Sequence, residues 1–106
     1  MANFKIIFDD VMLSQLKQAG KNKQVKNILS KMLDRIEELG PVAGKLIDSH
    51  LHIYEIKSKH PPIRLYFKHI MGLDNIYVFE YELKTSEEKQ RKTIFKIKRK
   101  ARKSFG

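Results

Sequence analysis

The sequence predicts an α+β domain, with two N-terminal helices packed on one face of a twisted antiparallel sheet and a basic helix at the C-terminus. Two patterns carry this prediction. Apolar residues recur at helical spacing within residues 10–39, whereas residues 53–85 hold short runs rich in β-branched and aromatic residues, separated by turns. A chain of 106 residues has the length of one domain with one modest core, so we expect a single domain over residues 1–106.

The first elements are an expected strand and a short helix. Phe4–Phe8 is an apolar run typical of a strand. A helix is predicted over residues 10–19, with Asp9 or Asp10 as its N-cap, because a carboxylate there accepts hydrogen bonds from free backbone N–H groups. Gly20 is expected to end it.

A second helix is predicted over residues 22–39, where apolar residues recur every three or four positions. These are Val25, Ile28, Leu29, Met32, Leu33, Ile36 and Leu39. At helical spacing they form one buried face. Gly40 and Pro41 are expected to stop the helix, and residues 41–49 match no element clearly.

Three strands joined by tight turns are predicted next, at Ile53–Lys57, Ile63–Lys68 and Ile76–Tyr81. Side chains alternate between the two faces of a strand. In the middle strand this directs one set toward the core, namely Ile63, Leu65 and Phe67. The opposite set is expected to face solvent or a ligand, on an open face of the sheet: Arg64, Tyr66 and Lys68.

A third helix is expected from near Ser86, because Thr85 and Glu88 have the spacing of a capping box. Its apolar stripe is narrow and consists of Ile94, Phe95, Ile97 and Ala101. Nine of the fifteen residues in the range 89–103 are basic. The end of this helix, from Lys103, is expected to fray.

The net charge of +10 is concentrated at the C-terminus. Residues 84–106 hold ten lysines or arginines and two glutamates, which leaves +2 for the rest of the chain. A phosphate backbone is the commonest partner for such a segment. An acidic partner protein fits equally well, and a solvated basic helix face is the alternative without a partner.

Several classes of protein are not expected. The chain has no cysteine, so disulfides and thiolate metal sites are excluded. The N-terminus lacks the pattern of a signal peptide and no run is long and apolar enough for a membrane span, so we expect a cytoplasmic location. His50 and His52 have a metal-like separation, but no third ligand follows at a recognised spacing, so we expect no metal and no cofactor.

The order of these elements resembles the RelE/HigB family of ribosome-dependent mRNA endonuclease toxins, within the RelE/ParE superfamily. Three segments carry the resemblance: Ile53–Lys57 (IYEIK) is similar to the family's "LYELR" strand, Ile63–Phe67 (IRLYF) to its "YRVFY" strand, and Tyr81–Thr85 (YELKT) to its "F-x-K-K-T" exit from the last strand. The resemblance implies a RelE-like fold, a cognate antitoxin with an acidic segment, and action on ribosome-bound mRNA.

The resemblance also implies a catalytic set. Metal-free RNA cleavage needs a proton acceptor for the 2′-OH, charge stabilisation at phosphorus and a proton for the leaving oxygen. Arg64 matches the family's phosphate-clamping arginine, and Lys57 and Lys84 match basic positions on the flanking strands. Tyr81 matches an aromatic position of the last strand, two residues after Phe79, where several relatives have histidine.

Further residues are candidates for RNA binding. Tyr66 can stack on a base, and the other candidates are basic: Lys68, Arg91, Lys92, Arg99 and Arg102. Each assignment has a structural alternative. For Arg64 the alternative is an ion pair with Glu55 or Glu80 across the sheet. Three functions therefore remain open: an mRNA interferase, a gyrase-poisoning toxin of the same superfamily, and a non-catalytic module that binds RNA or the ribosome.

Overall fold

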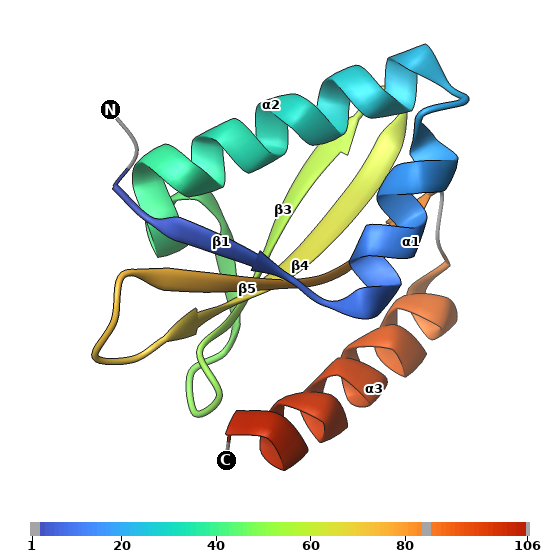
Figure 1. Cartoon of the computed structure of the whole chain (residues 1–106). Coiled ribbons are helices and arrows are strands. Elements are labelled where there is room, and N and C mark those ends of the chain that lie inside the picture. Colours follow the sequence, from blue (N-terminus) through green and yellow to red (C-terminus); the bar gives the residue numbers. More distant parts are fainter. Residues whose placement is uncertain (1–2, 84–85, 106) are drawn as a thin grey trace.

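The computed structural model describes residues 3–83 and 86–105, and it is an α+β structure as predicted. Figure 1 shows a central sheet with helices on both sides. The elements in chain order are β1 (Lys5–Phe8), α1 (Asp10–Ala19), α2 (Lys23–Leu39), the 3-10 helix η1 (Gly40–Ala43), β2 (Lys45–Asp48), β3 (Ile53–Lys59), β4 (Pro62–Ile70), β5 (Asn75–Leu83) and α3 (Glu87–Phe105). Within the described ranges no helix is long and apolar enough to cross a membrane.

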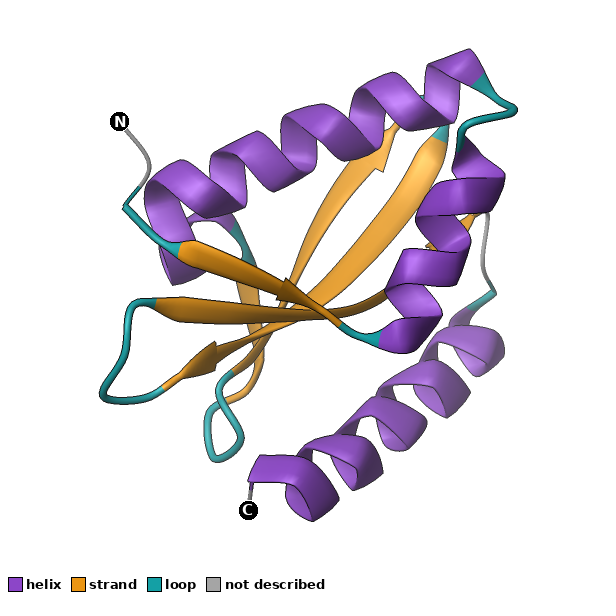
Figure 2. Cartoon of the chain, in the orientation of Figure 1, coloured by secondary structure: helices purple, strands orange, loops and turns teal. Residues whose placement is uncertain are grey.

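The sheet has five strands in the order β1-β5-β4-β3-β2. The predicted antiparallel meander is confirmed as β3, β4 and β5, and each strand is longer than its sequence pattern indicated. The opening strand β1 pairs in parallel with β5, so the sheet is mixed (Figure 2). Residues 41–49, which matched no element, form η1 and the short edge strand β2.

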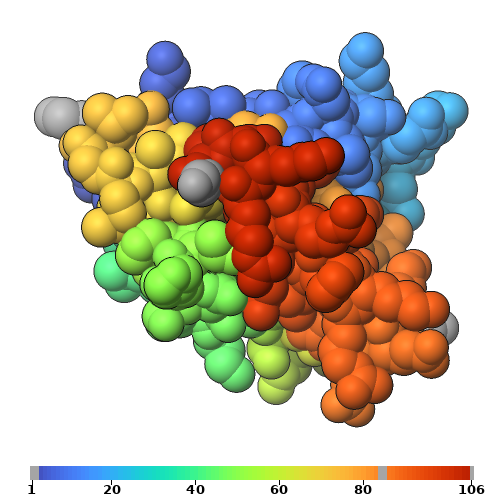
Figure 3. All heavy atoms as spheres, turned by 90° about the horizontal axis from the view of Figure 1, so that it is seen from below, coloured from blue at the N-terminus to red at the C-terminus, as the bar shows by residue number. Residues whose placement is uncertain are grey.

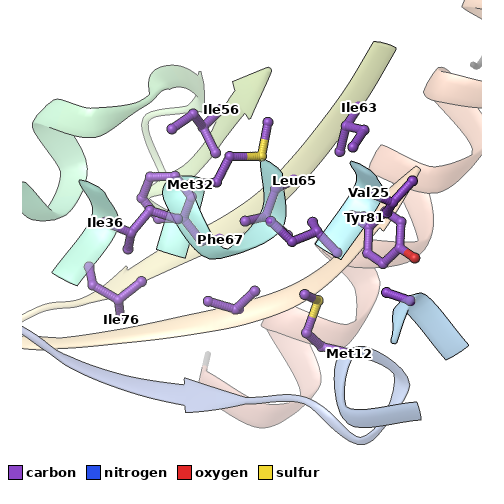
Figure 4. Close-up of a cluster of buried hydrophobic side chains, with 13 residues drawn as sticks. Met12, Val25, Met32, Ile36, Ile56, Ile63, Leu65, Phe67, Ile76 and Tyr81 are labelled. Carbon is purple, nitrogen blue, oxygen red and sulfur yellow. The ribbon is translucent and has the colours of Figure 1, made fainter. Parts of the chain in front are cut away.

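Helices α1 and α2 cover one face of the sheet and enclose the larger core (Figure 4). The predicted stripe of α2 supplies Met32 and Ile36, which pack with Leu65 and Phe67 of β4. All four side chains are less than 5% exposed. The helical spacing in α2 and the alternation in β4 therefore predicted the two apolar surfaces that meet in this core.

Helix α3 covers the opposite face, so the prediction that this face is open is wrong. Ile97 and Ala101 of α3 pack against Tyr66 and Phe79 in a second buried cluster. Tyr66 is fully buried and Lys68 is 7% exposed. These two residues therefore do not face bulk solvent, the first of the two expected alternatives, because α3 packs over this face of the sheet.

The C-terminal turn of α3 is held against the sheet, contrary to the expected fraying. The helix continues to Phe105, whose ring lies 5.0 Å from that of Tyr77 in an edge-on contact. At the start of the helix, the Ser86 hydroxyl accepts a hydrogen bond from the Lys89 N–H at 3.1 Å. The predicted cap residue Thr85 lies outside the described residues.

Candidate functional site

Polar side chains gather between the sheet and the first half of α3. Alternation along β3 and β4 directs Glu55 and Arg64 to this side. In β5, the pairing with β4 shifts register so that Phe79 has no partner. This bulge places both Phe79 and Glu80 on the α3 side, and Glu82 follows one period later.

Arg64 is paired with a buried carboxylate. Its Nη1 donates to both carboxylate oxygens of Glu55 at 3.2 Å, and the Gln90 side chain of α3 donates to Glu55 at 3.4 Å. The structural alternative for Arg64, an ion pair across the sheet, is thus confirmed for Glu55. Glu55 is 4% exposed, whereas 29% of the Arg64 side chain is exposed. Arg64 therefore remains reachable from solvent.

Arg64 lines a hollow of about 330 Å³ at the end of the sheet where β3 and β4 are joined. Lys57 lies directly opposite Arg64 in the β3–β4 register, and Lys59 lines the same hollow. The structure therefore brings together two of the predicted catalytic residues, Lys57 and Arg64. Three cationic side chains around one hollow attract a phosphate group.

Glu82 also lines this hollow, and the sequence patterns did not single it out. It is 6% exposed, and its Oε2 accepts a hydrogen bond from the Tyr66 hydroxyl at 3.2 Å. Its Oε1 has no hydrogen-bond partner among the described residues. Burial raises the pKa of Glu82, although the Tyr66 hydroxyl acts in the opposite direction, and the nearby Glu80 adds to the increase. A carboxyl group with a raised pKa is suited to proton transfer.

The signal that could have identified Glu82 was a strand that looks apolar on both faces yet carries carboxylates. A buried carboxylate is costly unless it is paired or protonated. Its neighbour Tyr66 responds to the same environment, because burial and the Glu82 charge raise the pKa of its hydroxyl. Glu82 and Tyr66 therefore form one coupled polar pair beneath α3.

Tyr81, another predicted catalytic residue, does not line the hollow. Tyr81 lies in the core on the α1 and α2 side, as Figure 4 shows, and its backbone N–H and carbonyl are both bonded to the Gln15 side chain. Tyr81 is therefore a residue of the larger core. Lys84 lies outside the described residues. The position that several relatives fill with histidine is held by Phe79, which is fully buried.

The histidines lie elsewhere. None of the residues lining the hollow is a histidine, and His69 contacts the Phe4 ring instead. In the described parts of the chain, no three histidine, cysteine, aspartate or glutamate residues are placed to hold a metal ion. The charged side chains that line the hollow are those of Lys57, Lys59, Arg64 and Glu82.

Helix α3 divides its basic residues between two roles. The predicted RNA-binding residues of this helix are all exposed: Arg91, Lys92, Arg99 and Arg102. Three lysines instead anchor the helix to carboxylates of the sheet side. Lys96 pairs with Glu80 at 3.0 Å, Lys98 with Asp48 at 3.2 Å, and Lys100 with Asp9 at 3.0 Å.

Comparison with solved structures shows how this arrangement relates to known folds. A doubly substituted mutant of the E. coli toxin RelE in the free state matches with a TM-score of 0.68 at 21% identity, over 92% of this chain and 99% of that one. The isolated E. coli RelE toxin matches with a TM-score of 0.65 at 21% identity, over 89% and 98% of the two chains. The chain has the RelE fold.

The chain is also similar to a structure of a toxin–antitoxin complex. The intact E. coli RelBE toxin–antitoxin complex matches with a TM-score of 0.64 at 20% identity, over 78% of this chain and 99% of that one. No protein-family model matches the sequence, and no curated protein matches it either. The RelE fold of this chain is thus visible in its three-dimensional structure at an identity of about one residue in five.

Proposed function

We propose that this chain is the toxin of a toxin–antitoxin pair and that it cleaves mRNA on the ribosome. The observation that carries the proposal is the hollow in which Lys57 and Arg64 stand side by side with Glu82, a carboxyl group of raised pKa. The RelE fold supports it, since the solved structures of this fold are described as toxins. The C-terminal charge supports a polyanionic target.

Cleavage in this hollow would proceed by attack of the 2′-OH on the adjacent phosphorus. The Glu82 carboxylate would take the proton of the 2′-OH, and Arg64 would stabilise the charge on the phosphoryl oxygens. The bond from phosphorus to the 5′-oxygen then breaks, and the Lys57 ammonium supplies the proton that the leaving oxygen needs. The products are a 2′,3′-cyclic phosphate and a 5′-hydroxyl end.

Arg64 can bind phosphate without first leaving Glu55. Only Nη1 is bonded to the Glu55 carboxylate, and an arginine has donors on three nitrogens. The pair with Glu55 holds the guanidinium in place, while Nη2 and Nε, which form no hydrogen bond with the described residues, are available to a phosphate group. Preorganisation of this kind lowers the cost of binding a transition state.

The exposed basic residues of α3 would hold mRNA or ribosomal RNA at long range. Arg91, Arg99 and Arg102 lie on the surface and take no part in the three anchoring ion pairs. Their attraction for phosphate falls with salt and does not depend on base sequence. Tyr66 can join this surface only if α3 moves, because it is fully buried beneath that helix, whereas Lys68 lines a cavity beside the last turn of α3.

We propose an antitoxin with an acidic segment as the protein partner. Because α3 already covers its face of the sheet, such a partner would have to displace α3 rather than cover an open face. The anchors of α3 are ion pairs of Lys96, Lys98 and Lys100, which an acidic segment can exchange for its own carboxylates. The association rate should then fall with salt, since electrostatic attraction acts mainly on encounter.

One observation favours the second candidate, a toxin of the same fold that acts on DNA gyrase by protein contact. Phe79 fills the position of a histidine found in several members of the RelE/HigB family. Its ring has no group that can transfer a proton, and it is buried beneath α3. A toxin acting by contact alone would not need Arg64 or Lys57.

The two functions separate in one experiment. Induction of the chain in a bacterial host should stop growth, and mapping of transcript 5′ ends should show new cuts carrying 5′-hydroxyl groups within translated regions. Growth arrest with intact transcripts would exclude the interferase and support gyrase poisoning. Normal growth at full expression would exclude both toxin proposals.

A further inference from the structure

A second cavity, of about 690 Å³, lies at the opposite end of β4 from the hollow. Its walls are the loop between β2 and β3, the end of β4 and the last turn of α3. Figure 3 shows these three segments meeting on one face, in green, yellow and red. Arg64 and Lys68 lie four residues apart on β4, which corresponds to about 13 Å at the usual rise of a strand. The two sites are therefore separate.

Lys68 lines this cavity as a buried cation without a counter-ion. It is 7% exposed, its Nζ donates to the Leu51 carbonyl at 2.5 Å, and the Phe105 ring lies 5.7 Å away. Among the described residues no carboxylate forms an ion pair with it. A buried ammonium group without an anion is costly, so the site favours binding of one.

The nearest acidic group does not fill that role. Asp48 accepts hydrogen bonds from the backbone N–H groups of His50 and Leu51 at 2.9 Å, and it forms an ion pair with Lys98 at 3.2 Å. Burial lowers the pKa of Lys68, and the Asp48 charge only partly offsets this. Within the described residues the Lys68 ammonium makes one hydrogen bond, to the Leu51 carbonyl, which leaves two N–H donors for a ligand.

The other polar side chains that line the cavity can also donate hydrogen bonds to an anion. His50, His52 and Arg102 line it together with Lys68, and none of the lining residues is acidic. A guanidinium binds two oxygens of a phosphate at once, whereas an ammonium acts as a point charge. Residues from three separate elements thus converge on one cavity with positive charge.

The remaining lining is apolar and includes Leu51, Ile70, Met71 and Phe105. Cavities of about 300–1,000 Å³ hold small organic ligands, so a bare phosphate would leave most of this one unfilled. An aromatic ring against the apolar wall would fill the rest. We propose that this cavity binds a phosphate monoester carried by a nucleoside, with Lys68 and Arg102 on the phosphate and the base against the apolar wall.

Two sources supply this chemistry, a free mononucleotide and the 5′-phosphorylated end of an RNA. Thermal unfolding at constant ionic strength should be followed with AMP, adenosine, inorganic phosphate, and one short RNA with and without a 5′-phosphate. A ligand that binds only the folded state raises Tm in proportion to its occupancy. AMP should raise Tm more than phosphate does, and adenosine should have no effect.

The two RNA forms identify the source. Because the basic residues of α3 are expected to bind both RNA forms, the difference between the two forms is the readout. Stabilisation by AMP with equal effects of the two RNAs indicates a free nucleotide, and greater stabilisation by the 5′-phosphorylated RNA than by its 5′-hydroxyl form indicates an RNA end. Stabilisation by adenosine equal to that by AMP would overturn the role of the phosphate. Absence of any effect of AMP and of the phosphorylated RNA would overturn the proposal as a whole.

Substitution of an arginine inside the cavity and of one outside it tests whether AMP binds there. Arg102→Gln should weaken AMP binding about tenfold or more, the loss expected for one charge-assisted hydrogen bond. Arg99→Gln is the matched control, because Arg99 is an exposed arginine of the same helix that does not line this cavity. Equal weakening by both variants would indicate diffuse charge attraction and overturn the proposal.

A Lys68→Met variant adds a readout that a merely structural lysine would not give. It should abolish AMP binding without lowering Tm, because it removes a buried charge that lacks a counter-ion. A fall in Tm with AMP binding retained would show that Lys68 only supports the fold. Arg102 is exposed, so its variant tests the site even if Lys68→Met does not fold.

Discussion

The Nη1 atom of Arg64 lies 3.2 Å from both carboxylate oxygens of Glu55, across the β3–β4 pairing. This relationship gives Arg64 two functions at once. It neutralises a carboxylate that is 4% exposed, and it presents a guanidinium at the edge of the candidate hollow. Substitution of Arg64 is therefore expected to change stability as well as the proposed activity, and experiments on this residue need a partner substitution.

Arg64→Ala should lower the free energy of unfolding by roughly 2–3 kcal/mol, because it leaves Glu55 buried without its cation. The value lies below that for a fully buried pair, since Arg64 is part exposed. The double variant Arg64→Ala/Glu55→Gln should recover most of the loss. Urea unfolding of the three proteins measures both effects. Equal destabilisation in the single and double variants would show that the ion pair is not the cause.

Asp9 joins three elements, and its loss should loosen α3 from the sheet. It caps α1 through the Val11 N–H at 3.0 Å and accepts hydrogen bonds from Tyr77 at 2.6 Å and Lys100 at 3.0 Å. Asp9→Ala should cost about 3 kcal/mol, combining a lost cap with a lost charge-assisted bond. Asp10→Ala, an exposed neighbour in the first turn of α1, is the control.

Hydrogen exchange locates the effect of the Asp9 substitution. Amides of α3 should exchange faster in Asp9→Ala than in Asp10→Ala under native conditions. Unchanged protection of α3 would mean that the ion pair between Asp9 and Lys100 contributes little to docking of the helix.

Glu82 should make stability depend on pH in a definite direction. Its pKa is raised in the folded state by burial, so its contribution to stability is greatest at low pH and is lost as pH rises through the folded pKa. Glu82→Gln keeps an acceptor for the Tyr66 hydroxyl but carries no charge. The variant should therefore gain stability relative to the parent as pH rises from about 4, the usual range of an unfolded glutamate, toward neutrality.

The parent protein alone cannot give this result, because Asp9 acts in the opposite direction. Burial tends to raise the pKa of Asp9, but hydrogen bonds from Tyr77, Lys100 and Val11 outweigh it and the pKa is lowered. The Asp9 contribution is thus lost as pH falls. Unfolding curves of the parent and of Glu82→Gln at several pH values isolate the contribution of Glu82 to the free energy of unfolding. A difference in stability between the two proteins that does not vary with pH would contradict the prediction.

The basic residues of α3 should differ in their effect on RNA binding. Neutralising the exposed Arg99 should reduce the slope of log Kobs against log salt by about one counterion. Lys100→Gln should change the slope less and lower stability instead, because Lys100 is paired with the buried Asp9. Titrations of an unstructured RNA at several salt concentrations compare the two variants. An equal change in slope for both would mean that the anchoring ion pair does not restrain Lys100.

The comparison of sequence and structure shows which features local patterns determine. Helix α2 and the alternation of β4 were predicted correctly because a single buried face imposes its period on the sequence. The burial of Tyr66 and Lys68 was not, because it depends on α3 docking from a distant part of the chain. Two apolar residues, Ile97 and Ala101, are too weak a signal for that contact.

The candidate site was predicted in part for a similar reason. Lys57 and Arg64 face each other in a register that the turn between their strands fixes, so their proximity follows from local sequence. Glu82 enters the site only because a bulge at Phe79 shifts the faces of β5, and no residue pattern signals that bulge. The same shift leaves Tyr81 in the opposite core.

The most direct test of the proposed activity is single-turnover cleavage of a ribosome-bound message by two variants of matched stability. Glu55→Gln keeps the guanidinium of Arg64, and Arg64→Ala/Glu55→Gln removes it. If Arg64 stabilises the transition state, the double variant should cut about 10²-fold more slowly or worse than Glu55→Gln, while its affinity for the ribosome stays the same. Equal cleavage rates, or a loss explained entirely by weaker ribosome binding, would contradict the account.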